Sequence, residues 1–128
     1  MQTKDPIKFY ATNAPYGEFS NCALYPIKLK GKVWKTSEHY FQAQKFAGTP
    51  YENKIRKAAS PMMAAQLGRT RKVRIRHNWD NIKDTIMYDA LYAKFTQHAD
   101  LKTLLLSTED APLIDFYYTN SLADFYPE

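Results

Sequence analysis

Cysteine is nearly absent from this chain, whose 128 residues include only Cys22. A single thiol closes no internal disulfide and builds no cysteine-rich metal site, so a disulfide scaffold is excluded and a reducing compartment is compatible. Long apolar runs are absent as well. Nowhere do about eighteen apolar residues follow one another, and the first nine residues lack the apolar stretch of a signal peptide. We therefore expect a soluble cytoplasmic protein with no membrane partner.

Clustered metal ligands are also missing from the sequence. Neither His77 nor His98 has partners at ligand spacing, and no acidic group suggests magnesium, so we predict no metal and no cofactor. The chain has no internal repeat and none of the helix-turn-helix, zinc-finger or stacked-aromatic strand motifs that read nucleic-acid sequence. General nucleic-acid binding is therefore a distant third hypothesis for function.

The length and composition predict one folded domain spanning residues 1–128. Hydrophobic residues make up 45% and aromatic residues 15% of the chain, as in a protein with a sizeable core. Basic residues are in excess, with a formal charge of +5 and a pI near 9.2. Much of this excess lies in one run that alternates with less polar residues, comprising Arg69, Arg71, Lys72, Arg74 and Arg76. This pattern fits either a solvated face or a phosphate-binding loop, because guanidinium groups match phosphate oxygens.

The hydrophobic pattern predicts an α+β fold, mostly helical, with a small antiparallel sheet or hairpin from the N-terminal third. We expect a strand at 7–10, a hairpin at 26–34 that turns at Gly31, and a strand at 113–116. Expected helices cover a stretch from Thr36 or Ser37 to about Ala47, then 51–59, 60–68, a long segment beginning at Asn78 or Asp80, and a short one around 101–105.

The predicted helix after Thr36 combines aromatic, charged and amide side chains. At about 100° per residue, Glu38, Gln42 and Lys45 fall within one arc about 60° wide. Periodicity alone favours an ordinary amphipathic helix with this arc in solvent, and leaves a functional site as the alternative. Glu38 also lies in the first helical turn, where the helix dipole favours a carboxylate. A ligand would fit between Glu38 and Lys45, which lie two helical turns apart.

Seven segments carry a family resemblance, and they are Y-G-E-F-S-N at 16–21, P-I-K-L-K-G-K-V-W at 26–34, T-S-E-H-Y-F-Q-A-Q-K-F at 36–46, S-P-M at 60–62, L-G-R at 67–69, N-W-D at 78–80 and K-F-T-Q-H at 94–98. In this order they resemble the NADAR family, whose bacterial members include YbiA-like N-glycosidases. The resemblance implies hydrolysis of the N-glycosidic bond of a phosphorylated ribosyl-base compound. The candidates are a phosphoribosylamino-pyrimidine of the riboflavin pathway and ADP-ribosylated guanine, the latter also within nucleic acid.

The resemblance further implies roles for individual residues. Glu38 and Lys45 become the catalytic candidates, and the expected wall or substrate-binding residues are Glu18, Asn21, Trp34, His39, Gln42, Trp79 and Arg69. For Trp34 and Trp79 the alternatives of stacking on a base and packing in the core stay open, and a structural hydrogen-bonding role stays open for His39. Cleavage of a ribosyl C–N bond needs an anion beside the sugar, which Glu38 would supply.

Two chemical routes are compatible with these residues. Glu38 would activate a water, or a neutral Lys45 amine would capture the opened sugar as a Schiff base. The second route requires Lys45 to lose its proton, which burial by aromatic residues favours and Glu38 opposes.

The C-terminal end departs from the family pattern. The expected tryptophan-glycine pair, loop and final helix do not follow Asp115, so the chain reads as a C-terminally shortened member. We expect the surface so exposed to be covered by Phe116, Tyr117, Phe125 and Tyr126, or by a second subunit in a homo-oligomer. This end keeps a second function open, a catalytically degenerate module that binds nucleotide or ADP-ribose without turnover.

Overall fold

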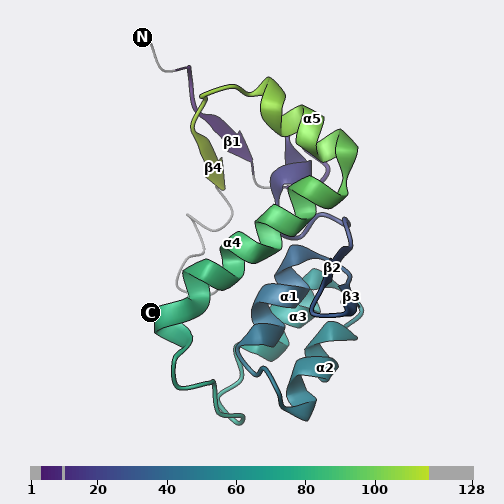
Figure 1. Ribbon diagram of the computed structural model, residues 1–128, viewed down its shortest axis with the longest axis vertical. Helices are drawn as coiled ribbons and strands as arrows, with labels where there is room; N and C mark the ends of the chain where they lie inside the picture. The colour runs from purple at the N-terminus through teal and green to yellow at the C-terminus, as the bar shows by residue number, and fades with distance from the viewer. Residues whose placement is uncertain (1–3, 10, 116–128) are drawn as a thin grey trace.

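The computed structural model describes residues 4–9 and 11–115, and has the predicted α+β architecture with helices in the majority. The longest helix, α4 (Trp79–Gln97), runs diagonally through the molecule (Figure 1). At one end of α4 lie α5 (Ala99–Ser107), β1 (Ile7–Phe9), β4 (Leu113–Asp115) and the short 3-10 helix η1 (Gly17–Phe19). Of the remaining elements, the first helix after the hairpin and the first strand of the hairpin pack along the other part of α4.

The predicted hairpin is present as β2 (Ile27–Leu29) and β3 (Lys32–Trp34), which pair in antiparallel register. The turn residues Lys30 and Gly31 have φ angles of 55° and 71°. Two successive positive φ values match the twist of the two strands, which explains why glycine occupies the second position. The hairpin places the Trp34 side chain in the core.

A second pair of strands joins the two ends of the described chain. β1 and β4 are parallel, with Ile7 opposite Leu113, and the Ile7 amide donates to the Pro112 carbonyl oxygen at 2.8 Å. The sequence predicted both strands but not their parallel pairing, which a long-range contact decides. The predicted positions Tyr10 and Phe116 and the aromatic residues beyond them lie outside the described residues.

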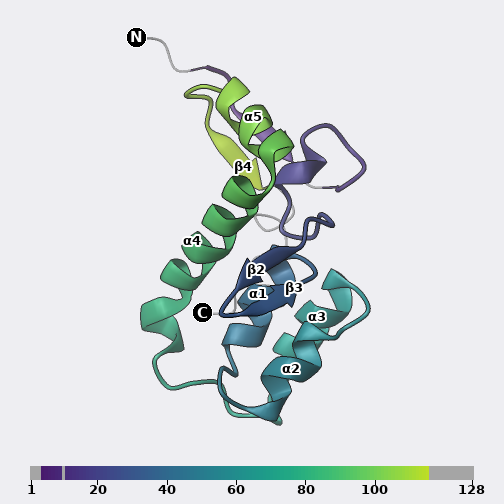
Figure 2. The ribbon, with the colours of Figure 1, turned by 45° about the vertical axis from the view of Figure 1, so that its right-hand side comes forward.

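Three helices build the compact region next to the hairpin: α1 (Ser37–Gln44), α2 (Pro50–Arg56) and α3 (Pro61–Gly68). Their starts follow the sequence signals, because Thr36 and Ser60 cap α1 and α3 through their hydroxyl groups and prolines occupy the first turns of α2 and α3. The helices α1 and α2 end about three residues earlier than predicted. Figures 1 and 2 show α1 between α4 and the α2–α3 pair.

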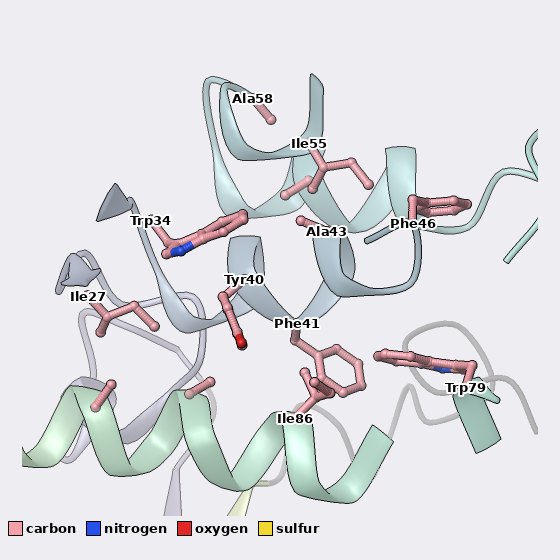
Figure 3. Close-up of a cluster of buried hydrophobic side chains, with 13 residues drawn as sticks. Ile27, Trp34, Tyr40, Phe41, Ala43, Phe46, Ile55, Ala58, Trp79 and Ile86 are labelled. Atoms are coloured by element: carbon pink, nitrogen blue, oxygen red, sulfur yellow. The ribbon is translucent and has the colours of Figure 1, made fainter. Parts of the chain in front are cut away.

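The main hydrophobic cluster surrounds α1. Tyr40 and Phe41 point from α1 towards α4, and Trp34 lies on the side of α1 that faces away from α4 (Figure 3). Aromatic rings meet edge to face in this cluster, Trp34 with Tyr40 at 5.0 Å and Phe41 with Trp79 at 5.1 Å between centroids. Within the described residues, no helix combines the length and apolar content needed to cross a bilayer.

Candidate active site

The polar arc of α1 is buried, so the solvated face that periodicity alone favoured is wrong. All eight residues of the helix are buried, and Glu38 and Gln42 have no exposed surface. The reason is tertiary: α2, α3, α4 and β3 all contact α1 and remove its side chains from bulk solvent. Periodicity describes one helix in isolation and does not report how many neighbours enclose it. Glu38, Gln42 and Lys45 therefore share a protein interior.

Glu38 is held at the N-terminus of α1 by two neighbours. The Gln42 Nε2 amide donates to Glu38 Oε2 at 2.8 Å, one helical turn away. The Glu38 backbone N–H donates to the Asn21 carbonyl oxygen at 3.1 Å, and the Ser37 hydroxyl donates to Asn21 Oδ1 at 2.8 Å. The loop that carries Asn21 thus fastens the first turn of α1 and the carboxyl group within it.

Lys45 follows the last residue of α1 and is only 1% exposed. Its Nζ donates to the Gly68 carbonyl oxygen, the last residue of α3, at 3.3 Å. Burial lowers the pKa of Lys45 to about 8, with the nearby Glu38 opposing this shift and Arg69 and Lys83 adding to it. Roughly one amine in ten is then neutral at pH 7, against on the order of one in several thousand for a solvated lysine.

We predict that the free energy of unfolding rises with pH because of Lys45. An unfolded lysine keeps its proton up to about pH 10.5, whereas the folded one loses it near 8, so the unfolded chain binds more protons in this window. The destabilisation is full below pH 8, on the order of 3 kcal/mol at most, and it fades as pH rises towards 10.5. Urea unfolding across this window is expected to show the rise in wild type and not in Lys45→Met.

Tyr40 limits that window at its alkaline end. Burial raises the pKa of Tyr40 to about 12, so the folded phenol keeps its proton when the unfolded one loses it and stability falls above about pH 10. Measurements between about pH 8 and pH 10 therefore isolate the lysine. Equal slopes in wild type and Lys45→Met would contradict the assignment of the rise to Lys45.

Gly68 sets the close approach of α3 to α1. A Cβ at this position would lie 2.1 Å from Gln42 Oε1, 2.8 Å from Gln42 Cδ and 3.0 Å from Gln42 Cβ. The carbonyl of the same residue accepts from Lys45. A side chain at position 68 would therefore force Gln42 out of its present position.

We predict that Gly68→Ala lowers the free energy of unfolding by roughly 1–3 kcal/mol through overpacking. The measurement is the urea midpoint, with Gly68→Ala/Gln42→Ala as the matched variant. Removing most of the Gln42 side chain makes room for the new methyl group, so the double variant should lose less stability than the two single losses added together. Simple additivity would show that the clash lies elsewhere.

Three of the proposed wall residues are buried and contact other residues of the protein core. Trp34 has no exposed surface, and its indole N–H donates to the Leu29 carbonyl oxygen at 3.0 Å. His39 contacts Thr36 Oγ1 through Nδ1 at 2.8 Å and the Ala58 carbonyl oxygen through Nε2 at 3.1 Å, and burial lowers its pKa. Trp79 packs on Phe41. These contacts favour the structural alternatives that the sequence left open for all three.

The basic run forms the loop between α3 and α4. Arg71, Lys72 and Arg74 are exposed, whereas Val73 and Ile75 pack against the core cluster. The Arg76 backbone N–H donates to the Lys45 carbonyl oxygen at 2.9 Å. Arg69 is exposed at the end of α3 and acts electrostatically on Lys45. Both ends of this basic loop therefore lie near Lys45, and its middle extends into solvent.

Glu18 has a different environment from Glu38. It lies on η1, is half-buried, and adds to burial and Asp100 in raising the pKa of Tyr25. Sequence reasoning missed two contributors to the site, Gly68 and Lys83. Gly68 is the last residue of the predicted helix 60–68 and lies in the L-G-R segment, but neither feature indicates its contact with Gln42. Lys83 carries no local signal, because only the packing of α4 brings it near Lys45.

A groove of about 550 Å³ lies away from this site, along α4 and the hairpin. Its lining includes Leu29, Tyr88, Tyr92 and Gln97 and none of the polar residues of α1. A catalytic group must touch its substrate, so this groove is not where Glu38 and Lys45 would act. Within residues 4–9 and 11–115, no three His, Cys, Asp or Glu side chains are placed to hold a metal ion.

Known proteins with similar sequences include two named N-glycosidase and one named for riboflavin biosynthesis. N-glycosidase YbiA of Escherichia coli is 53% identical over 109 residues, which cover 85% of this chain and 68% of that protein. N-glycosidase Npun_R5314 of Nostoc punctiforme is 42% identical over 90% of this chain and 76% of its own. Riboflavin biosynthesis protein PYRR of Zea mays is 35% identical over 85% of this chain, but only 20% of its own length is matched.

The fold comparison agrees with the sequence comparison. The solution structure of E. coli YbiA superposes with a TM-score of 0.81 at 50% identity, covering 90% of this chain and 68% of YbiA. The NADAR domain matches residues 8–122, which is most of the sequence. These relatives support an N-glycosidase class of hydrolase, as the sequence predicted. The chain belongs to the NADAR domain family.

Proposed function

We propose that this protein hydrolyses the N-glycosidic bond of a phosphorylated ribosyl-base compound, with Glu38 and Lys45 as its catalytic residues. The observation that carries the proposal is a buried lysine amine with a pKa of about 8, on the same helical arc as a buried carboxyl group. The names of the bacterial relatives support the same bond class. A phosphoribosylamino-pyrimidine is our first candidate substrate, supported by the name of the maize relative, and ADP-ribosylated guanine is the second.

Glu38 suits the charge that develops during cleavage. As the C–N bond breaks, positive charge grows on the anomeric carbon of the ribose and negative charge on the departing base. A buried carboxylate stabilises that cation more strongly than a solvated one, because little water screens it. The Gln42 amide fixes one carboxylate oxygen, at 2.8 Å, and so holds the group in one orientation. Glu38 would also accept a proton from an attacking water.

Lys45 suits a covalent route. Its neutral amine attacks the anomeric carbon, and the base leaves with the electron pair of the C–N bond and takes up a proton. The ring C–O bond of the resulting glycosylamine then breaks as a proton passes from Nζ to the ring oxygen, which leaves the opened sugar as an imine on Nζ. One water then hydrolyses the imine, which restores the amine and releases a reducing sugar. The low pKa of Lys45 supports this route over direct attack by water, because a neutral amine is available near neutral pH.

The basic loop would hold the phosphate of the substrate. Arg69 lies near Lys45, and Arg71, Lys72 and Arg74 extend from it into solvent. A phosphate on the ribose would meet guanidinium groups there while its anomeric carbon faces Lys45. We propose small molecules as the main substrates and a cytoplasmic location. Nucleic acid that carries ADP-ribosylated guanine is a further candidate for this loop.

The test is incubation of the protein with phosphoribosylamino-pyrimidine and, separately, ADP-ribosylated guanosine, with and without borohydride. Chromatography measures the free base and a reducing-sugar assay measures the second product. Borohydride should trap a sugar adduct, which peptide mass spectrometry should place on Lys45. Turnover without an adduct would favour attack by water directed by Glu38. Tight binding of either compound without release of base would instead establish the degenerate binding module.

A further inference from the structure

Lys94 is a second buried lysine, which the proposed reaction does not use. It lies on α4 with no exposed surface, and its Nζ donates to the Ser20 carbonyl oxygen at 2.7 Å. The rings of Tyr25 and Phe95 lie 5.8 Å and 5.6 Å from the same nitrogen. Burying an amine is costly, and an apolar side chain of equal length would pack against these rings without that cost. An apolar side chain would lack the hydrogen bond that the Lys94 amine makes to Ser20.

The residue that follows Ser20 holds the start of α1. The Asn21 carbonyl accepts from the Glu38 N–H at 3.1 Å, and Asn21 Oδ1 accepts from the Ser37 hydroxyl at 2.8 Å. Residues 20–26 form no helix or strand, so this segment depends on such contacts for its position. A continuous series of hydrogen bonds and one peptide unit thus leads from α4 through Ser20 and Asn21 to Glu38.

We infer that Lys94 is a positioning residue for Glu38: its amine fixes the Ser20–Asn21 segment against α1, and this segment orients the carboxyl group towards the ribose. The inference rests on the proposed N-glycosidase function. Lys94 does not touch the substrate in this scheme. Its effect is on the alignment of Glu38, and a misplacement of about 1 Å costs up to roughly a hundredfold in rate.

The test compares Lys94→Met, which keeps an unbranched apolar side chain, with wild type. We expect kcat for release of base to fall about ten- to a hundredfold, with KM changed less than about twofold. Amide hydrogen exchange supplies a readout that needs no activity. The Glu38 amide should exchange at least about tenfold faster in Lys94→Met, while the amides of Ala43 and Ala90 stay protected. Ile86→Val on α4 is the control for general loosening of that helix.

A second variant cuts the same series of contacts at α1. Ser37→Ala removes the hydroxyl that binds Asn21, and it should lower kcat in the same sense as Lys94→Met even if Lys94→Met does not fold. Because both act through one segment, the double variant should lose less than the product of the two single losses, whereas Ser37→Ala and Ile86→Val should multiply. Unchanged kcat in Ser37→Ala, or unchanged Glu38 exchange in Lys94→Met, would overturn the inference. Wild type inactive on both substrates would overturn the proposed function instead, and the exchange result would still decide the role of Lys94.

Discussion

Replacing Lys45 by methionine is expected to lower kcat by at least about a thousandfold while the protein stays folded. Methionine keeps the length of the buried side chain and removes the amine, so the loss reports chemistry and not packing. The substitution also removes a costly buried amine, which should leave the protein at least as stable below pH 8. Release of base and urea unfolding, measured on the same preparations, separate the two effects. Lys57→Met, at an exposed position, is the matched control and should retain full activity.

Two further observations identify the role of the Lys45 amine. If the neutral amine attacks the sugar, kcat of wild type should rise with pH through about 8, the pKa of Lys45. Lys45→Arg should then be as inactive as Lys45→Met, because a guanidinium stays charged and does not attack carbon. Substantial activity in Lys45→Arg would show that position 45 supplies positive charge to the departing base and not a nucleophile.

Changing Glu38 to glutamine is expected to lower kcat by about a hundred- to a thousandfold. The side chains have nearly the same shape, and a glutamine carbonyl oxygen still accepts from Gln42 Nε2, so the fold should persist. What disappears is the negative charge beside the anomeric carbon. Glu52→Gln is the matched control, because Glu52 Oε2 accepts from Gln44 Nε2 at 2.9 Å in a similar carboxylate-amide pair outside the site. Its activity should stay within about twofold of wild type.

The Glu38→Gln variant also tests the direction in which Glu38 shifts the pKa of Lys45. Glu38 raises the pKa of Lys45 against the larger effect of burial. Without the carboxylate charge, that pKa should fall below 8, and the midpoint of the residual pH–activity curve should move to lower pH. The residual rate of Glu38→Gln across about pH 6 to pH 9 is the measurement. A midpoint that moves upward, or full activity in Glu38→Gln, would remove Glu38 from the catalytic pair.

Local signals in the sequence predicted much of the fold. The hydroxyls of Thr36 and Ser60, Pro61 after its cap and the glycine in the hairpin turn act within a few residues, so they specify where elements start and turn whatever surrounds them. The long apolar repeat of α4 was equally clear. Helix ends were less accurate, and the parallel pairing of β1 with β4 joins segments about a hundred positions apart.

The candidate site was named by resemblance, and the structure changed its physical setting. Residue types and spacing on α1 identified Glu38, Gln42 and Lys45 as one arc but indicated solvent. Burial of that arc depends on helices from elsewhere in the chain, and so do the approach of Gly68 and the charges of Arg69 and Lys83. The low pKa of Lys45 follows from those neighbours and from no property of the helix alone.

The family, the order of the helices and strands, and the polar residues that share a face of α1 follow from the amino-acid sequence, because each depends on residue identity or on short-range periodicity. The burial of this face, the structural contacts of Trp34 and His39, and the connection from Lys94 to Glu38 through Ser20 and Asn21 follow from the packing of the folded chain. Dielectric environment and hydrogen-bond partners arise from segments far apart in the chain, and their effect on an ionisable group appears only when those segments pack together.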